Sequence, residues 1–301
     1  MNVTGILIKR NIKLFFKDKG MFFTSLITPM ILLVLYATFL GNVYKDSLLS
    51  SIPKGIEIAD KIVNGYVGGQ LISSILAVSC VTVAFCSNML MVQDRANGSI
   101  KDLYVSPVNK TSLAFSYYIA SLTSTFIICF AAAVVCLIYI AVIGWYLTIS
   151  DVLFILLDVF LLVMFGTALS SVINFFLSTQ GQISAVGSIV SSAYGFICGA
   201  YMPISQFSDS LQNIVKFLPG TYGTSLLRNH SMSGVFGELE KTGVPNEVID
   251  IMKNVVDCNI EFFDREVTIP NMYLILSVAV IVLILVYVLL NKKCLSVKSN
   301  K

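Results

Sequence analysis

The chain has 301 residues, of which 56% are hydrophobic and only 12% are charged, and its formal net charge is +3. A soluble domain carries about 25% charged residues, so this composition excludes a soluble enzyme or binding domain and indicates a protein embedded in a bilayer. The cysteines lie mostly in or beside apolar segments, and His230 is the only histidine, so neither a disulfide framework nor a metal site is expected.

Residues 1–20 predict a basic amphipathic helix on the cytoplasmic side of the membrane. Its apolar side carries Leu7 and Phe15, and its opposite side carries Lys9, Arg10 and Lys13. Such a helix lies in the interface and is attracted to anionic lipid headgroups. It either contacts a cytoplasmic partner or is an ordinary basic flank of the first span. The apolar run that follows is too long for a signal peptide and lacks a cleavage site, so we expect an anchor helix.

Six uncharged or nearly uncharged runs predict six transmembrane helices, because a span needs about 20 apolar residues. They cover residues 21–40, 71–92, 112–143, 152–176, 183–200 and 272–290. The third run is long, and we interpret it as one tilted helix that ends near Trp145. The segments on the side of the two termini carry far more basic than acidic residues, so the positive-inside rule places both termini in the cytoplasm.

This topology divides the all-α membrane protein into four parts. Residues 1–20 form the cytoplasmic amphipathic helix. Residues 21–200 hold the first five spans, with an external loop at 41–70 and a cytoplasmic hairpin at 93–111. Residues 201–269 form an extracytoplasmic re-entrant hairpin and a small cap, with a short helix at 246–256. Residues 270–301 hold the sixth span and a basic cytoplasmic tail.

The cytoplasmic hairpin has the signals of a short, capped helix. Ser99 followed three residues later by Asp102 is a capping-box pattern, which predicts a helix that begins at Ile100. Gly98 permits a sharp turn before it, and the dipeptide 106–107, Ser-Pro, ends it. This leaves Arg95, Lys101 and Asp102 available to a partner. The alternative is a solvated turn that caps itself.

The hairpin carries an ordered motif: an acidic residue and Arg, then Gly, a hydroxyl residue, Leu, and Ser-Pro. These are Asp94, Arg95, Gly98, Ser99, Leu103, Ser106 and Pro107. The motif resembles the coupling helix of type-2 ATP-binding-cassette (ABC) exporter permeases, although that family usually has Glu in place of Asp94. Downstream, Pro219 to Tyr222 and the pair Leu227-Arg228 resemble the pattern that follows the fifth span of these permeases. The resemblance covers nearly the whole chain outside about 230–269.

The resemblance implies a six-span permease that pairs with a second permease half, identical or related, and with two copies of a separate ABC ATPase. ATP and Mg²⁺ would bind the ATPase, because this chain has no phosphate-binding Gly-x4-Gly-Lys-Ser/Thr loop and no cofactor site of its own. Coupling would pass through the hairpin residues already named, together with Lys101 and Asp102. Basic residues follow membrane topology, so no nucleic-acid partner is expected.

Small residues recur every fourth position in the fifth predicted span, at Gly187, Ser191, Gly195 and Gly199. This spacing lets helix backbones approach closely in lipid. It serves either packing within the chain or a transport pathway or dimer interface, to which Ser79 and Thr82 of the second span would add hydroxyl groups. A mostly apolar pathway of this kind suits an amphipathic substrate such as an antibiotic, a hydrophobic peptide or a lipid.

The sequence predicts that the external hairpin consists of two short amphipathic segments separated by Pro219 and Gly220. The second segment ends at Arg228. With Tyr222, these residues form either an external gate or an anchor for the cap.

Asp158 is the only ionisable residue predicted inside a span, which makes it a functional candidate by default. We expect it to pair with a Ser, Tyr or backbone donor, and Asn174 of the same span to hydrogen-bond between helices. Two other functions stay open: an exporter of glycans or lipid-linked polysaccharides from the same family, and a channel or secondary transporter that works alone. The latter predicts paired charges or broken helices in mid-membrane.

Overall fold

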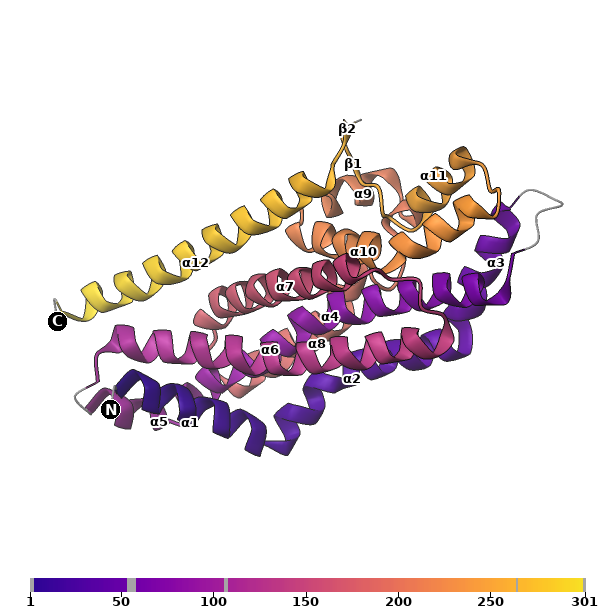
Figure 1. The fold of residues 1–301 in the computed structure, drawn as a ribbon. Helices are drawn as coiled ribbons and strands as arrows, with labels where there is room; N and C mark the ends of the chain where they lie inside the picture. Colours follow the sequence, from indigo (N-terminus) through magenta and orange to yellow (C-terminus); the bar gives the residue numbers. More distant parts are fainter. Residues whose placement is uncertain (1–2, 53–57, 106–107, 264, 300–301) are drawn as a thin grey trace.

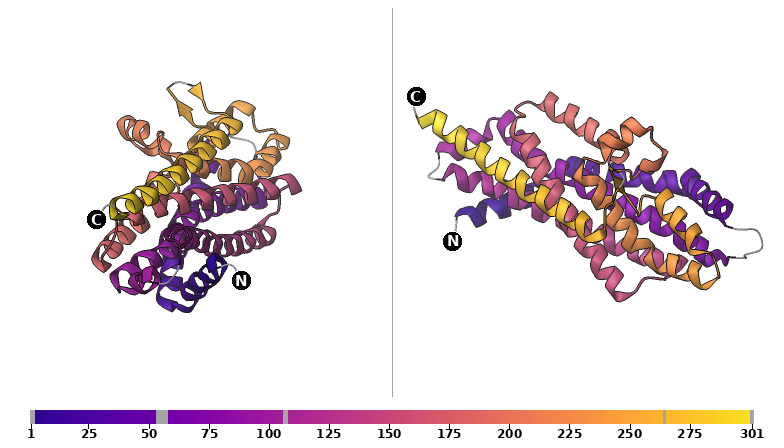
Figure 2. Two further views of the ribbon diagram at one scale, coloured as in Figure 1. Left: turned by 90° about the vertical axis from the view of Figure 1, so that its left-hand side faces the viewer. Right: turned by 90° about the horizontal axis from the view of Figure 1, so that it is seen from above.

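The computed structural model describes residues 3–52, 58–105, 108–263 and 265–299. The helices run roughly along one long axis (Figure 1). The ends of α1 and α12 that carry the two termini lie at the same end of the molecule as α5, and α3 and α11 lie at the other end (Figures 1 and 2). The location of the two termini in the cytoplasm stays a prediction.

The described elements are almost all helical. In chain order they are α1 (Val3–Lys17), α2 (Lys19–Leu35), the π-helical turn η1 (Tyr36–Leu40), α3 (Gly41–Ser51), α4 (Asp60–Ala96), α5 (Ser99–Val105), α6 (Lys110–Ile143), α7 (Ile149–Phe175), α8 (Gln180–Ile197), the 3-10 turn η2 (Ile204–Gln206), α9 (Asp209–Val215), α10 (Pro219–Lys241), α11 (Asn246–Val255) and α12 (Ile269–Ser299). Strands β1 (Glu261–Phe262) and β2 (Arg265–Glu266) form a small antiparallel hairpin.

Five described stretches are long and apolar enough to cross a membrane: Lys19–Ser50, Asp60–Ala96, Thr111–Ile143, Ile149–Phe175 and Ile269–Asn291. They confirm a multi-pass, all-α membrane protein. The third is one continuous helix, as the sequence predicts. Helix α8 occupies the place of the predicted fifth span, but it begins with Gln180 and Gln182 and carries several serines, and it is not among the five. The number of six spans therefore stays a prediction.

Helix α4 is the centre of the bundle. It packs against α2, α6, α7, α8 and α10. In its most apolar stretch 94% of the residues are buried inside the protein, whereas the corresponding share for α12 is 17%. Helix α12 contacts mainly α7 and α10 and turns an apolar side outward, with Leu274, Ile281 and Leu285 more than half exposed. An outward apolar face of this kind matches surrounding lipid.

The amphipathic N-terminal helix is present as α1, and it is tied to the bundle. Its buried residues are Leu7, Asn11 and Phe15, and the helix packs against α6. Asp18 lies between α1 and α2. Its carboxylate accepts a hydrogen bond of 3.0 Å from the amide of Met21 and so caps the start of α2.

The predicted end of the external hairpin at Arg228 is wrong. Helix α10 begins at Pro219, a position where the missing amide hydrogen of proline costs nothing, and continues without a break to Lys241. Leu226, Leu227 and Met232 on this helix are completely buried. The sequence of α10 is too polar to predict a long helix from apolar residues alone. A helix surrounded by protein rather than lipid can have this composition. Helix α11 confirms the predicted short helix at 246–256.

Candidate functional site

The hairpin between α4 and α6 contains the short helix α5 at the predicted place. Gly98 has a φ of +79°, a left-handed conformation that glycine adopts without steric cost, and the chain turns there into α5. Lys101 and Asp102 are exposed, and the Val105 side chain is 88% exposed. Ser106 and Pro107, the predicted end of the helix, lie outside the described residues.

Asp94, at the end of α4, holds three helices together. Its carboxylate accepts a hydrogen bond of 2.8 Å from the guanidinium of Arg10 in α1 and one of 2.5 Å from the hydroxyl of Tyr117 in α6. The Asp94 side chain is only 10% exposed. Both contacts are charge-assisted, which makes them stronger than neutral hydrogen bonds.

Arg95 caps the C-terminal end of α7. Its guanidinium donates to the carbonyl oxygens of Phe175 at 2.8 Å and Leu177 at 3.2 Å, and it lies 5.6 Å from the centre of the Phe175 ring. The last carbonyls of a helix lack partners within the helix and favour a cation. The expectation that Arg95 is available to a partner is therefore wrong in this structure, because Nη1 is bound to carbonyls at the end of α7 and Nη2 lies against the sulfur of Met91.

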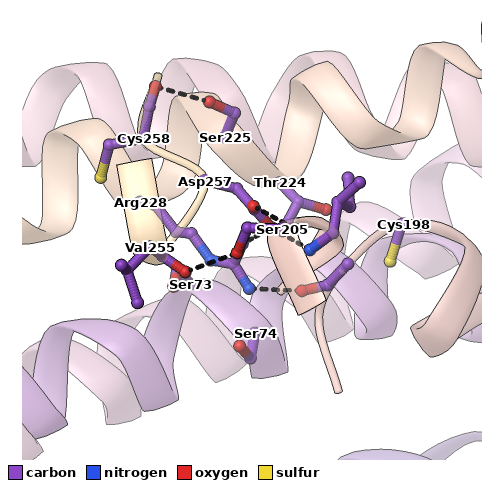
Figure 3. Close-up of polar contacts among 12 residues, drawn as sticks. Ser73, Ser74, Cys198, Ser205, Thr224, Ser225, Arg228, Val255, Asp257 and Cys258 are labelled. Carbon is purple, nitrogen blue, oxygen red and sulfur yellow. Dashed lines mark hydrogen bonds and ion pairs between the residues drawn. The ribbon is translucent and has the colours of Figure 1, made fainter. Parts of the chain in front are cut away.

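Arg228 of α10 is completely buried and forms an ion pair with Asp257, which follows α11 (Figure 3). The distance from Arg228 Nη1 to the Asp257 carboxylate is 2.9 Å, and Arg228 Nη2 donates to the carbonyl of Gly199 after α8. The Asp257 carboxylate also accepts from the amides of Ile204 at 2.6 Å and Ser205 at 3.2 Å. Burial raises the pKa of Asp257, although Arg228 and these amides lower it.

A second set of bonds reinforces this cluster. Ser225 and Asn229 of α10 donate to the carbonyl of Cys258, at 3.0 Å and 2.6 Å. Asp257 adopts a φ of +54°, which is uncommon outside glycine and is held here by its hydrogen bonds. Burial raises the pKa of the Cys258 thiol to about 12, so the thiol stays protonated near neutral pH. Arg228, predicted at a gate, is thus a fixed connector between α8, α10 and α11.

The turn between α9 and α10 is closely packed. The hydroxyls of Thr221 and Tyr222 donate to the carbonyls of Val215 at 2.9 Å and Lys216 at 2.6 Å. A Cβ atom on Gly220 would lie 2.6 Å from the hydroxyl oxygen of Tyr194 in α8. Glycine at 220 therefore serves a close approach between α10 and α8, and the turn is fixed by side chains in this structure.

The family described as ABC-2 type transporter matches residues 2–230. The chain belongs to this family. It is therefore an ABC permease, the membrane transport subunit of a system whose ATP hydrolysis belongs to an ABC ATPase partner. A search of the curated proteins gave no match.

The small residues at 187, 191, 195 and 199, here called the small-residue ladder, have side chains of this permease as neighbours, and Gly195 packs against a tyrosine. The Tyr201 ring lies where a Cβ atom of Gly195 would be, and the Tyr201 hydroxyl donates to the carbonyl of Ser191 at 3.2 Å. Gly187 faces Met89 of α4, and Gly199, with a φ of +74°, lies in the turn after α8. These contacts support the alternative of packing within the chain.

Ser79 and Thr82 are buried in the central helix α4. Their hydroxyls donate to carbonyls of the same helix, at Ile75 with 2.6 Å and at Val78 with 3.0 Å. Neither residue is more than 2% exposed. In this conformation the two side chains face the interior of the subunit, so the expected contribution of their hydroxyls to a pathway is not seen.

Asp158, in the N-terminal half of α7, has two partners. Its carboxylate lies 2.6 Å from Nδ1 of His230 in α10 and accepts a hydrogen bond of 2.5 Å from the hydroxyl of Tyr273 in α12. The His230 ring stacks on Phe154, with 4.9 Å between the ring centres. The tyrosine partner matches the expectation, whereas the sequence gives no signal for the histidine partner, because His230 is 72 residues away from Asp158 along the chain.

The amide that links α4 with α7 comes from Asn88 rather than from Asn174. Asn88 Nδ2 donates to the hydroxyls of Ser170 at 3.0 Å and Ser171 at 2.6 Å. The Asn174 side chain is buried, and within the described ranges its amide has no hydrogen-bond partner. Its backbone carbonyl contributes to the Arg95 cap at 3.4 Å.

In the part of the chain that the structure describes, no group of three His, Cys, Asp or Glu side chains lies close enough together to hold a metal ion. A cavity of about 530 Å³ lies on the side of α10 and α11 and is lined by His230, Glu240, Asp250 and Lys253 among others.

Proposed function

We propose that this permease is the membrane part of an exporter that moves an amphipathic molecule out of the cytoplasm or the inner leaflet. It pairs with a second permease half, identical or related, and with two copies of the ABC ATPase, which bind ATP and Mg²⁺. Both termini and α5 lie in the cytoplasm, and α8 acts as the fifth of six spans.

The observation that carries this proposal is the position of α5. The helix exposes Lys101, Asp102 and Val105 at the end of the molecule where the termini lie. A valine side chain 88% exposed beside two charged groups is a suitable contact for another protein.

The contacts on the α4 side of α5 favour a role in transmitting motion. Asp94 joins α4 to α1 and α6, and Arg95 joins α4 to α7. A displacement of α5 by the ATPase would therefore move four helices together through charge-assisted bonds. We propose that Asp94 and Arg95 transmit this displacement, whereas Lys101, Asp102 and Val105 meet the ATPase.

Two observations bear on the alternatives. The extensive packing of residues 201–260 through Arg228 and Asp257 gives the permease a substantial external assembly, which argues against a glycan exporter with a short external region. The Asp158–His230 pair is a feature that a secondary transporter would need. Membership of a family that works with an ABC ATPase favours the exporter.

A single charge on α5 tests the proposal. Val105→Asp should abolish co-purification with the ATPase, because a charge replaces an apolar contact in a small interface. Ile251→Asp is the matched control, since Ile251 is 57% exposed on α11 at the other end of the molecule. Equal ATPase binding by Val105→Asp and the wild-type permease would contradict the proposal. Transport that persists without ATP would favour the secondary transporter.

A further inference from the structure

A very small cavity with a mostly polar surface lies between α1, α4 and α6. Its walls include Asn11 and Phe15 of α1, Asn88 of α4, and Tyr117 and Ser124 of α6. The centre of a water-sized sphere can occupy about 10 Å³ of it. By this measure a single buried water molecule needs about 10–15 Å³. The cavity therefore has room for one water molecule and for no larger ligand.

The amide of Asn11 provides a hydrogen-bond donor without a partner. Asn11 is only 2% exposed, and its Nδ2 makes no hydrogen bond to the residues that the structure describes. The orientation of this amide is fixed by its other atom, because Asn11 Oδ1 accepts a hydrogen bond of 2.8 Å from the guanidinium of Arg10. Turning the amide over would place its N–H groups against those of Arg10. A buried donor of this kind is unfavourable unless a ligand accepts its hydrogen bond.

The amide of Asn88 provides the opposite, a hydrogen-bond acceptor. Its Nδ2 donates to Ser170 and Ser171 of α7 at 3.0 Å and 2.6 Å, whereas its Oδ1 has no partner in the described ranges. The hydroxyl of Ser124 is also buried and has no partner there. Three helices thus bring one donor, one acceptor and one hydroxyl, which can act as either, to the walls of the same cavity.

The combination of these groups identifies the ligand. A metal cation would need acceptors only, and the N–H donor of Asn11 would repel it. An anion would need donors only, and the amide oxygen of Asn88 would oppose it. Water both donates and accepts, and a buried water typically makes about three hydrogen bonds. The size of the cavity and the chemistry of its walls therefore select the same ligand.

We propose that this cavity binds one ordered water molecule, which accepts a hydrogen bond from Asn11, donates one to Asn88 and shares a third with the hydroxyl of Ser124. The water joins α1 to α4 and α6 beside the contact between Arg10 and Asp94. A bridging water is nearly as good as a direct hydrogen bond. The contact of α1 with the bundle is therefore hydrated, and the water satisfies polar groups that do not bind one another.

Hydroxyl radicals can detect this water. X-ray pulses split every water molecule, bound water included, whereas photolysis of added hydrogen peroxide makes radicals in the solvent. Radicals formed beside a phenylalanine ring hydroxylate it, and mass spectrometry measures the product. Phe15 lines the cavity and is 1% exposed, whereas Phe85 of α4 is 2% exposed and does not line it. With the full-length permease in lipid nanodiscs, we expect a higher ratio of X-ray to peroxide labelling at Phe15 than at Phe85.

Two valine variants locate the water. Ser124→Val fills the cavity with methyl groups, so the labelling ratio of Phe15 should fall to that of Phe85. Ser184→Val is the control and should leave the ratio of Phe15 high, because Ser184 is exposed on α8 and does not line the cavity. Equal ratios for Phe15 and Phe85 in the wild type would overturn the proposal, even if Ser124→Val did not fold. A high ratio at Phe15 that survives Ser124→Val would also overturn it, because the water would then lie elsewhere.

The loss of the Ser124 hydroxyl gives a second readout. Ser124→Ala removes one hydrogen bond of the water, so the equilibrium constant for unfolding in detergent should rise about fivefold. Thr167→Val removes a hydroxyl that is also buried and has no partner among the described residues, but Thr167 does not line this cavity. This control should be as stable as the wild type or more stable. A Ser124→Ala variant that is no less stable than the wild type would contradict the proposal.

Discussion

The guanidinium of Arg228 and the carboxylate of Asp257 lie 2.9 Å apart, with side-chain exposures of only 1% and 7%. The two residues belong to α10 and to the turn after α11, and together they also bind the ends of α8 and η2. The turn after α11 is therefore attached to α8 and α10 by a buried ion pair, so the segment that contains it is not a loose cap.

Removing the cation of this pair should destabilise the permease strongly. Arg228→Met leaves a buried carboxylate without its partner, and we expect a loss of about 3–5 kcal/mol in the free energy of unfolding. The double variant Arg228→Met/Asp257→Leu should recover part of this loss, because both buried charges are gone. Chemical unfolding in detergent measures the effect.

An exposed ion pair supplies the control. The Lys241 side chain is 73% exposed and lies 2.7 Å from Glu238, so Lys241→Met should change stability by no more than about 1 kcal/mol. If Arg228→Met is as mild as Lys241→Met, the buried pair does not hold the external assembly.

The Arg228→Met variant should also respond to pH. Burial already raises the pKa of Asp257 in the native permease, and loss of Arg228 removes the charge that lowers it. The folded state then binds a proton more readily than the unfolded state, whose aspartate has a pKa of about 3.9. The stability of the variant should therefore fall as pH rises above about 4, and more steeply than that of the wild type. Parallel stability curves between pH 5 and pH 8 would contradict this.

Local signals in the sequence were sufficient for much of the fold. The capping pattern at Ser99 predicts α5, the uncharged run at 112–143 predicts α6, and the short helix near Asn246 is found as α11. Each of these depends on neighbouring residues alone.

The buried polar contacts could not be predicted in the same way. Arg228 and Asp257 are 29 residues apart, and Asp158 and His230 are 72 residues apart. Only tertiary packing brings them together. The length of α10 was missed for a related reason, because a helix enclosed by protein needs no continuous apolar run and therefore lacks the signal of a membrane span.

Arg95 should strengthen the connection between the C-terminal ends of α4 and α7. Arg95→Gln replaces the guanidinium that caps three carbonyls, and we expect a loss of about 1.5–3 kcal/mol in stability. Lys101→Gln on exposed α5 should cost little, which separates the cap from a general effect of charge. Arg95→Lys should be intermediate, since one ammonium cannot reproduce the geometry of the guanidinium. Equal unfolding midpoints for Arg95→Gln and Lys101→Gln would contradict the role of the cap.

The glycines of α8 allow a matched comparison. Gly195→Ala forces a Cβ atom against the Tyr201 ring, whereas Gly181→Ala places one in open space. Overpacking costs about 1–3 kcal/mol, so Gly195→Ala should lower the thermal stability in detergent and Gly181→Ala should keep or raise it, because alanine favours helix. Similar behaviour of the two variants would show that the ladder is not used for packing.

Tyr222 tests whether the turn between α9 and α10 is a gate or an anchor. Its hydroxyl holds the Lys216 carbonyl at 2.6 Å, and Tyr222→Phe removes this bond while it keeps the ring. If the turn opens as a gate, the open state should become about fivefold more populated, as expected for the loss of about 1 kcal/mol. Hydrogen exchange of the amides in residues 209–222 measures this change.

We expect that exchange to rise in Tyr222→Phe, while α5 and the binding of the ATPase stay unaffected, because the turn lies far from α5 along the bundle (Figure 1). Tyr139→Phe is the control for the loss of a tyrosine hydroxyl, since Tyr139 is 44% exposed on α6. Faster exchange together with slower or leaky export identifies the turn as a gate. Faster exchange with export at the wild-type rate identifies it as an anchor, because local opening would then have no part in release. Unchanged exchange would show that the Tyr222 hydroxyl does not hold the turn closed, and the prediction would be wrong.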